Sequence, residues 1–290
     1  MNNLLDLSEK IDPLSAALFT SVSETAGSLG IAFFVVGATA RDMIFDLGHG
    51  RPSRRATLDR DFGVRVESWA EFAKLKESLL TSGLFQETKE VQRLRFQGEL
   101  DVDIVPFGGV AGNHEEIRWP PNEDVVMSTV GFDDAYRAAQ SVRVKASPAL
   151  DILVASIPGL TILKLISWAD RPHVPSKDAI DLAFILEGYL DAGNNERLFE
   201  EHLDLVDVEG FDYERTGARL LGRDLAKIAA PETMKRIREI LAKETTDEGR
   251  HSLLIRAMMP AGSVSDGENG NRFNQLLILL LELLKGINDL

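Results

Sequence analysis

The sequence contains no cysteine, which excludes disulfide bonds, thiolate metal sites and a cysteine nucleophile. No stretch approaches the roughly 20 consecutive apolar residues of a membrane span, so we expect no membrane association. The first residues, MNNLLDLSEKIDP, lack a basic segment followed by an apolar one, so we expect no secretory signal. Together these absences favour a cytoplasmic protein.

Positive charge is in the minority. Lys and Arg number 32 against 46 Asp and Glu, which gives a formal net charge of −14. Tight non-specific binding of nucleic acid needs a basic surface, because neutralisation of phosphates supplies most of the affinity. We therefore expect any contact with nucleic acid to come from a local patch, or the ligand to be small. An acidic surface also serves solubility alone.

The 290 residues, 44% hydrophobic and 27% charged, are typical of a globular protein with one large domain or two ordinary ones. We expect an α+β fold, with a mixed β-sheet and flanking helices over residues 1–155. From residue 156 to 290 the apolar spacing is near 3.6, which predicts a mostly helical domain. Within that domain we expect a linker at 260–271 and a terminal helix at 272–288.

The N-terminal half shows alternating strand and helix signals. A helix is predicted at 14–29, and 31–42 reads as a buried strand that turns at Gly37 into a helix. The remaining expectations are a strand at 58–66, a helix at 68–83, a hairpin at 84–97, a strand at 99–109, irregular chain at 111–137 and one or two strands within 141–155.

Two pairs of acids stand on predicted strands. Asp59 and Asp61 in LDRDF are two residues apart, so both side chains face the same side of a strand. Asp101 and Asp103 in LDVDIVPF have the same spacing. If the two strands are neighbours, acids from both meet on one face of the sheet. Asp103 is the better third ligand because the apolar IVPF after it fixes it on a buried strand; Asp101 is the alternative.

Three carboxylates without cysteine and with only five histidines make a hard oxygen site suited to Mg²⁺ or Mn²⁺. Two such ions about 3.5–4 Å apart activate an attacking oxygen and stabilise a leaving one in phosphoryl transfer. The alternative is that the D-x-D pair lies on an exposed strand and is simply solvated.

A glycine-led loop precedes these acids. Gly37 follows a buried strand, where the backbone can approach a ligand closely. The N–H groups that follow, with Thr39, can bond phosphate oxygens at a helix N-terminus. Arg55, four residues before Asp59, is the candidate to reach a triphosphate or an acceptor phosphate. A plain turn and a solvated loop are the alternatives.

The order of these features resembles the DNA polymerase β-type nucleotidyltransferase superfamily. Within it the chain is most similar to the AbiEii-like nucleotidyltransferases, the toxin halves of abortive-infection and toxin–antitoxin pairs, which include the MenT toxins. Their G-G-T-A-L start resembles GATAR here, and their G-H-R-x-S-x-D-[IL]-D-F segment resembles GHGRPSRRATLDRDF. In that segment Arg55, Thr57 and Phe62 stand in the matching places.

The resemblance implies transfer of a nucleoside monophosphate from an NTP to a hydroxyl, with release of pyrophosphate. Asp59 and Asp61 would hold both metals, and Asp103 would hold the catalytic metal and help to deprotonate the attacking hydroxyl. The implied nucleotide-binding residues are Gly37, Ala38, Thr39, Arg55, Thr57 and Lys164.

The resemblance continues into the second half. Family members carry a lysine on the helix after the sheet and then K-D-x-x-D-L, matched here by Lys164 and by Lys177, Asp178 and Asp181. It implies that Lys164 contacts the triphosphate and that Asp178 completes the active site from the second domain. From the residues alone, Lys164 would be a helix-surface residue and the acids would favour the helix dipole.

Three departures from the family pattern favour altered substrate choice rather than lost activity. Ala38 replaces the second glycine, the loop from Gly37 to Asp59 is long, and Arg60 stands where an apolar residue is usual. Because Arg60 should face the opposite side of the sheet from the acids, either that side is open or an acid neutralises it.

The implied acceptor is the 3′ end of tRNA, and the implied partner is a cognate antitoxin. A protein or small-molecule hydroxyl is the alternative acceptor. A different reading is a non-catalytic module that senses nucleotide or binds a partner. GATARD also resembles the G-G-x-V-R-D of tRNA CCA-adding enzymes, but the helical half shows none of their further motifs.

Overall fold

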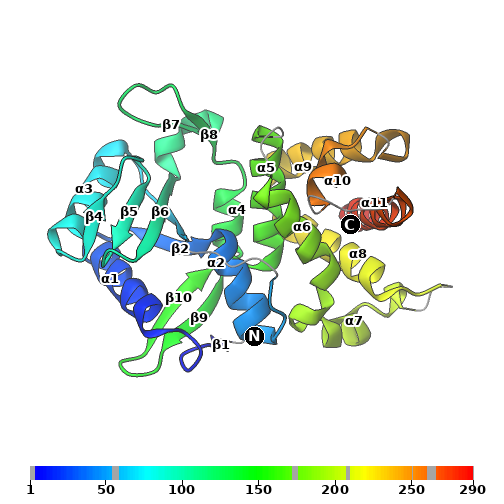
Figure 1. Cartoon of the computed structure of the whole chain (residues 1–290), viewed down its shortest axis with the longest axis horizontal. Coiled ribbons are helices and arrows are strands. Elements are labelled where there is room, and N and C mark those ends of the chain that lie inside the picture. Colours follow the sequence, from blue (N-terminus) through cyan, green and yellow to red (C-terminus); the bar gives the residue numbers. More distant parts are fainter. Residues whose placement is uncertain are drawn as a thin grey trace. The chain divides into compact units, whose positions relative to one another are not determined.

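The computed structural model describes residues 4–53, 59–171, 176–206, 210–249, 251–259 and 266–289. The chain folds into two compact units, Met1–Ser156 and Ile157–Leu290. The first carries a mixed sheet and the second is helical (Figure 1), which confirms the predicted α+β class.

The first unit is built on an eight-stranded mixed sheet with the order β1-β9-β10-β2-β3-β6-β5-β4. β3 runs parallel to β6 and antiparallel to β2, and β5 pairs antiparallel with β6. The strands are β1 (Leu5–Asp6), β2 (Ala32–Val36), β3 (Arg60–Arg65), β4 (Phe85–Glu87), β5 (Arg93–Phe96), β6 (Leu100–Phe107), β9 (Gln140–Lys145) and β10 (Leu150–Val154). A separate hairpin joins β7 (Glu116–Arg118) to β8 (Val126–Ser128).

The two longest helices of this unit begin and end close to where the sequence signals predict them. Asp12 caps the first helix by accepting a bond from the N–H of Ser15, and Gly30 ends it with φ 67°. Ser68 caps the helix at 69–81 in the same way. The helices are α1 (Pro13–Leu29), α2 (Gly37–Asp42), η1 (Met43–Gly48), α3 (Trp69–Thr81), η2 (Gly109–His114) and α4 (Phe132–Arg137).

One expectation for this unit is wrong. Residues 111–137 were expected to be irregular, but they include β7, β8 and α4. Each of the two strands has three residues, which is too short for alternation of polar and apolar residues to show in the sequence. Val125, just before the second strand, and Val126, its first residue, are exposed, so burial does not mark this strand either.

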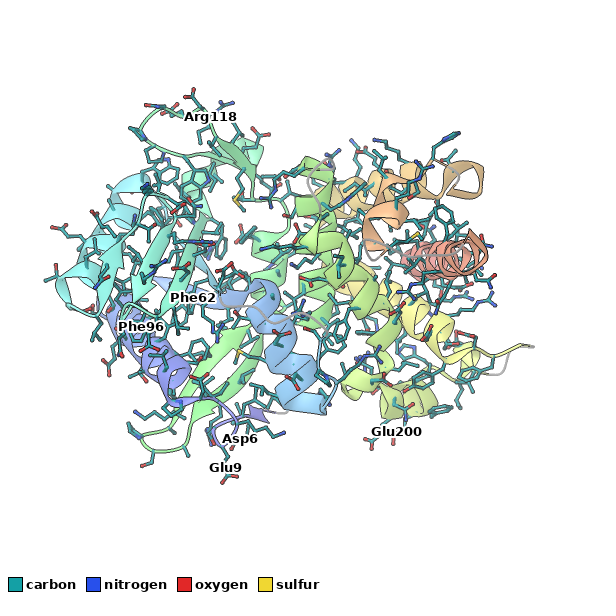
Figure 2. All side chains as sticks on the ribbon, viewed as in Figure 1. Asp6, Glu9, Phe62, Phe96, Arg118 and Glu200 are labelled. Carbon is teal, nitrogen blue, oxygen red and sulfur yellow. The ribbon has the colours of Figure 1, made fainter. Side chains whose placement is uncertain are left out.

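The sheet buries an aromatic core on both faces. On one face, the ring of Phe62 in β3 packs 6.1 Å from that of Phe19 in α1. On the other, Phe34 packs 5.5 Å from Phe107 and 5.6 Å from Tyr136 in α4. Because side chains alternate along a strand, Asp61 and Asp103 share the face of Phe107 and lie opposite Phe62. Phe62 and Phe96 can be located in Figure 2.

The second unit is a helical bundle, as predicted from residue 157 onward. α11 packs closely along α8 because Gly222 and Gly286 bring the two backbones together, and a Cβ on either glycine would collide with the other helix. The helices are α5 (Ile157–Asp170), α6 (Lys177–Gly188), η3 (Leu190–Asn194), α7 (Asn195–Glu201), η4 (Leu203–Leu205), α8 (Tyr213–Ile228), α9 (Pro231–Thr245), η5 (Thr246–Gly249), α10 (Leu253–Met258) and α11 (Asp266–Asn288).

The linker expected at 260–271 is wrong from residue 266 onward, where α11 has already begun. Extending a helix costs far less than nucleating one, so the buried apolar segment that includes Leu276 and Leu280 can propagate the helix backward through polar residues. Residues 260–265 lie outside the described part of the chain. In that part, no helix combines the length and apolar character needed to cross a membrane.

Candidate active site

Three neighbouring strands bring acidic and basic side chains together on one face of the sheet. Asp61 in β3 lies directly opposite Asp103 in the parallel strand β6. Arg93 in β5 lies opposite Asp103 on its other side. Because paired strands are about 4.8 Å apart, the three residues form a row across the sheet. The strand pairing on which the predicted acid cluster depended is therefore present.

A second acid–base pair lies beside this row. Asp101 in β6 is opposite Arg95 in β5, whose Nε donates to its Oδ1 over 2.8 Å. Asp59 immediately precedes β3, and its carboxylate lies 3.8 Å from the guanidinium of Arg93. We refer to Asp59, Asp61, Asp101 and Asp103 as the carboxylate cluster.

Arg93 makes ionic contacts with three acids of the cluster. Its Nε and Nη2 donate to Oδ1 and Oδ2 of Asp103, both over 2.7 Å, in a bidentate pair. Its Nη1 lies 3.6 Å from Asp101. These hydrogen bonds to Asp103 are the main reason why the pKa of Arg93 is raised above its ordinary value. In this structure the positive charge between the carboxylates is therefore a guanidinium.

Arg93 is not among the site residues predicted from the sequence, although the sequence contains a signal for it. Arg93 and Arg95 are spaced by two, as are Asp101 and Asp103, and a short turn at 97–99 separates the two pairs. In an antiparallel hairpin this spacing places opposite charges across from each other on one face.

Gly37 lies against the carboxylate of Asp61. It follows Val36, which pairs with Asp61, and it begins α2 with φ 65°. A Cβ at this position would collide with the Asp61 carboxylate. Only glycine therefore suits both the backbone conformation and the close approach, so the glycine-led turn and the carboxylate cluster form one continuous site.

The next two residues of this turn are buried. Ala38 and Thr39 are 6% and 7% exposed. The hydroxyl of Thr39 donates to the carbonyl oxygen of Asp59 over 3.1 Å, which ties α2 to the chain just before β3. No side chain caps the N-terminus of α2, which begins after Val36.

Arg60 points to the other face, as expected, and meets an acid there. Its Nη2 donates to Ser15 Oγ over 3.4 Å. Burial alone would raise the pKa of Asp12, but hydrogen bonds from Ser15 and the charge of Arg60 together lower it. The charge of Arg60 therefore lies near an acid at the start of α1. Arg55 and Thr57 lie outside the described residues.

Lys164 and Asp178 belong to the second unit and contact each other. The Nζ of Lys164 in α5 lies 2.8 Å from Asp178 Oδ1 and 2.7 Å from Asp181 Oδ2, both in α6. The side chains of Lys164 and Asp181 are 11% and 1% exposed. Ser167 Oγ also donates to Asp178, over 3.0 Å. Lys164 is therefore buried in an ion cluster, not on the helix surface as its local sequence alone suggested.

In this ion cluster, the neighbouring charges together shift the pKa values of Lys164 and Asp178 more than burial does. Burial alone would lower the pKa of Lys164, but the two aspartates raise it above its ordinary value. Burial would likewise raise the pKa of Asp178, but Lys164 and the Ser167 hydroxyl lower it. Lys164 and Asp178 are therefore charged at neutral pH.

The carboxylate cluster has the donor chemistry for a hard divalent cation, since its oxygens come from carboxylates on adjacent strands. In the arrangement described, however, Arg93 occupies both oxygens of Asp103. Across the described residues no group of three or more carboxylate, imidazole or thiolate side chains is arranged to hold a metal ion. The residues fit Mg²⁺ or Mn²⁺ chemically once Asp103 is released from Arg93.

A comparison with protein-family profiles matches residues 24–260 to the family described as "Nucleotidyl transferase AbiEii toxin, Type IV TA system". The chain belongs to the AbiEii nucleotidyltransferase toxin family. The match spans both units, and it confirms the resemblance and the assignment of this AbiEii-family chain as a nucleotidyltransferase. A search of curated proteins finds no match.

Solved structures give weaker likenesses. The antibiotic-resistance factor ANT(2'')-Ia is 13% identical with a TM-score of 0.36, covering 68% of this chain and 97% of its own. An antigenic nucleotidyltransferase-like protein from Paracoccidioides brasiliensis is 15% identical with a TM-score of 0.38, covering 68% and 92%. A CCA-adding enzyme in complex with ATP is 16% identical with a TM-score of 0.35, covering 93% and 68%. At these TM-scores the likeness carries no functional argument.

Proposed function

We propose that this AbiEii-family chain is a metal-dependent enzyme that moves a nucleoside monophosphate from an NTP to a hydroxyl acceptor and releases pyrophosphate. One observation carries the proposal: Asp61 and Asp103 lie side by side on neighbouring strands, with Gly37 directly against Asp61. This arrangement joins a carboxylate pair to a turn where phosphate can approach the backbone. Residues 1–155 would form the catalytic domain and 156–290 a helical domain.

Asp59, Asp61 and Asp103 are the proposed ligands of Mg²⁺ or Mn²⁺. A bound divalent ion would supply Lewis-acid stabilisation of the phosphoryl oxygens and of the leaving pyrophosphate. Asp103 would also accept the proton of the attacking hydroxyl, since its carboxylate lies at the centre of the row. Thr39 would hold Asp59 in place through its bond to the Asp59 carbonyl.

The triphosphate would bind along the glycine-led turn. Gly37 and Ala38 would offer backbone N–H groups at the uncapped start of α2, which continues directly into η1. Arg55 and Thr57 would add side-chain contacts from the loop before β3. The family resemblance further implies that Lys164 contacts the triphosphate and that Asp178 completes the active site; these two residues form a 2.8 Å ion pair with each other.

We further propose that the acceptor is a tRNA 3′ end and that the protein acts in the cytoplasm as a toxin with a cognate antitoxin. The family description supports the toxin role. The acceptor rests on the resemblance to tRNA-modifying toxins of this family, while the net charge of −14 gives it no support. A protein or small-molecule hydroxyl is the alternative acceptor, and a non-catalytic nucleotide sensor is the alternative function.

The test is label transfer. The full chain is incubated with Mg²⁺ and each α-labelled NTP in turn, with bulk tRNA, total RNA or no added acceptor. An Asp59→Ala, Asp61→Ala variant of confirmed fold is the control. We expect label in tRNA with the wild type and none with the variant. Label in the protein itself would show that the acceptor is a protein hydroxyl and not tRNA. Absence of label and of pyrophosphate release under every condition, including with a metabolite extract, would refute the proposal that the chain transfers nucleotides.

A further inference from the structure

We propose that Arg93 is a displaceable cation that closes the carboxylate cluster, so that a divalent metal can bind Asp61 and Asp103 only when the guanidinium releases Asp103. This inference rests on the proposed function, because it concerns access of the metal to the same site. It assigns to Arg93 the role of a positioning residue that competes with the metal.

The contacts of Arg93 are those of an ion held by several carboxylates. It meets two acids of β6, Asp103 through two bonds of 2.7 Å and Asp101 at 3.6 Å, and it lies 3.8 Å from Asp59, which immediately precedes β3. The bidentate pair turns both oxygens of Asp103 toward β5, which is the strand on the far side from Asp61. A metal shared by Asp61 and Asp103 needs one of these oxygens turned toward β3.

Charge adds to this geometric conflict. A dication between Asp61 and Asp103 would lie within one strand spacing of the guanidinium, because Arg93 is directly opposite Asp103. Like charges at that distance repel strongly in a partly desolvated site. The two cations therefore compete for one set of carboxylates.

Arg93 is able to leave Asp103 without losing every partner. Its side chain is only 26% exposed, but it lies within 4 Å of Asp101 and Asp59 as well. A small rotation toward Asp101, which is not among the proposed metal ligands, would keep an ion pair while freeing Asp103. Arg95 makes a single ionic hydrogen bond one row away, where its Nε donates to Asp101 over 2.8 Å.

Arg95 provides a matched control. It is on the same strand and face as Arg93, and it also makes an ionic hydrogen bond to β6. Only Arg93 contacts Asp103, however. Replacing either arginine by glutamine removes one positive charge from the same face, so a difference between the variants reports the contact with Asp103 and not the net charge.

The experiment measures Mn²⁺ binding to the full chain without nucleotide, from the EPR signal of free Mn²⁺. We expect Arg93→Gln to bind Mn²⁺ about tenfold more tightly than the wild type or better, since it removes a bidentate charge-assisted pair. Arg93→Lys, which keeps the charge but loses the planar fork, should fall between the two. Arg95→Gln should differ from the wild type by less than about threefold. Circular dichroism confirms that each variant is folded.

Two results would overturn the inference: an affinity of Arg93→Gln equal to or weaker than that of the wild type, or equal tightening in Arg95→Gln. An Asp61→Asn, Asp103→Asn variant separates this failure from failure of the proposed function. If the wild type binds Mn²⁺ through these acids and Arg93→Gln binds it no better, only the role of Arg93 fails. If neither the wild type nor Arg93→Gln shows binding that depends on these acids, even with NTP, the metal site itself fails.

Discussion

Replacing Lys164 by methionine should destabilise the helical unit severely. The substitution keeps a long unbranched side chain but removes the ammonium charge that lies 2.7 Å from Asp181, whose side chain is 1% exposed. Asp178, with its side chain 22% exposed, loses the same partner. Removing the cation from a buried ion pair is among the largest single costs a mutation can impose.

The magnitude follows from the burial of the ion cluster. Breaking a buried ion pair by removing one partner costs about 3–5 kcal/mol. For a unit of this size that corresponds to a fall in Tm of roughly 10 °C or more. Neutralising the two acids at the same time, by Asp178→Asn and Asp181→Asn, removes the negative charges that Lys164 balanced. The triple variant should therefore recover to within about 1–2 kcal/mol of the wild type.

The assay is urea unfolding of the full chain together with hydrogen exchange of peptides from α5 and α6, because exchange reports the free energy of opening locally. Arg171→Gln is the control. Arg171 is 66% exposed and 3.9 Å from Asp178, so its loss should cost less than about 1 kcal/mol. The reasoning is refuted if Lys164→Met costs no more than Arg171→Gln, or if the triple variant is as unstable as the single one.

Three further outcomes are expected. Gly37→Ala should lose more than about 1 kcal/mol of stability and most of its transfer activity, because the new Cβ would collide with the Asp61 carboxylate and alanine is strained at the positive φ of this position. Urea unfolding measures the stability and label transfer measures the activity. Unchanged values of both would contradict this prediction. Glu244→Ala should lower the free energy of unfolding in urea by about 2–3 kcal/mol, since the buried carboxylate accepts bonds from the Ser252 hydroxyl and from a backbone N–H of α10. A loss below about 0.5 kcal/mol would exclude this role. The pKa of Asp178 is lowered in the folded chain, so its contribution to stability is present above its unfolded pKa of about 3.9 and is lost as pH falls through the lower folded value. Acid titration of hydrogen exchange in α6 should show this loss in the wild type, and Asp178→Asn should lack it.

Much of the site could be predicted from periodicity. The two-residue spacing of Asp59 and Asp61, and of Asp101 and Asp103, fixes which side chains share a face. Once β3 and β6 pair in the observed register, Asp61 and Asp103 must meet. The apolar strand that ends at Gly37 also predicted the turn into α2, because a positive φ after a buried strand favours glycine.

The partners of these charges could not be predicted in the same way. That Arg93 opposes Asp103 depends on the length of the turn between β5 and β6, and a shift of one residue would move it to the other face. Lys164 looked like a surface residue because a lone lysine on a helix is usually solvated. Its burial depends on two acids of α6, 14 and 17 residues later, which only the packing of α5 on α6 brings to it.

The most direct test of the account compares Asp103→Asn with Asp101→Asn in the label-transfer assay. The two acids are on the same strand and the same face, each pairs with an arginine, and only Asp103 lies opposite Asp61. Loss of a metal ligand should reduce transfer by Asp103→Asn at least about a hundredfold, while Asp101→Asn should retain activity within about tenfold of the wild type. Equal losses in the two variants, or a larger loss in Asp101→Asn, would contradict the assignment of Asp61 and Asp103 as the reaction centre.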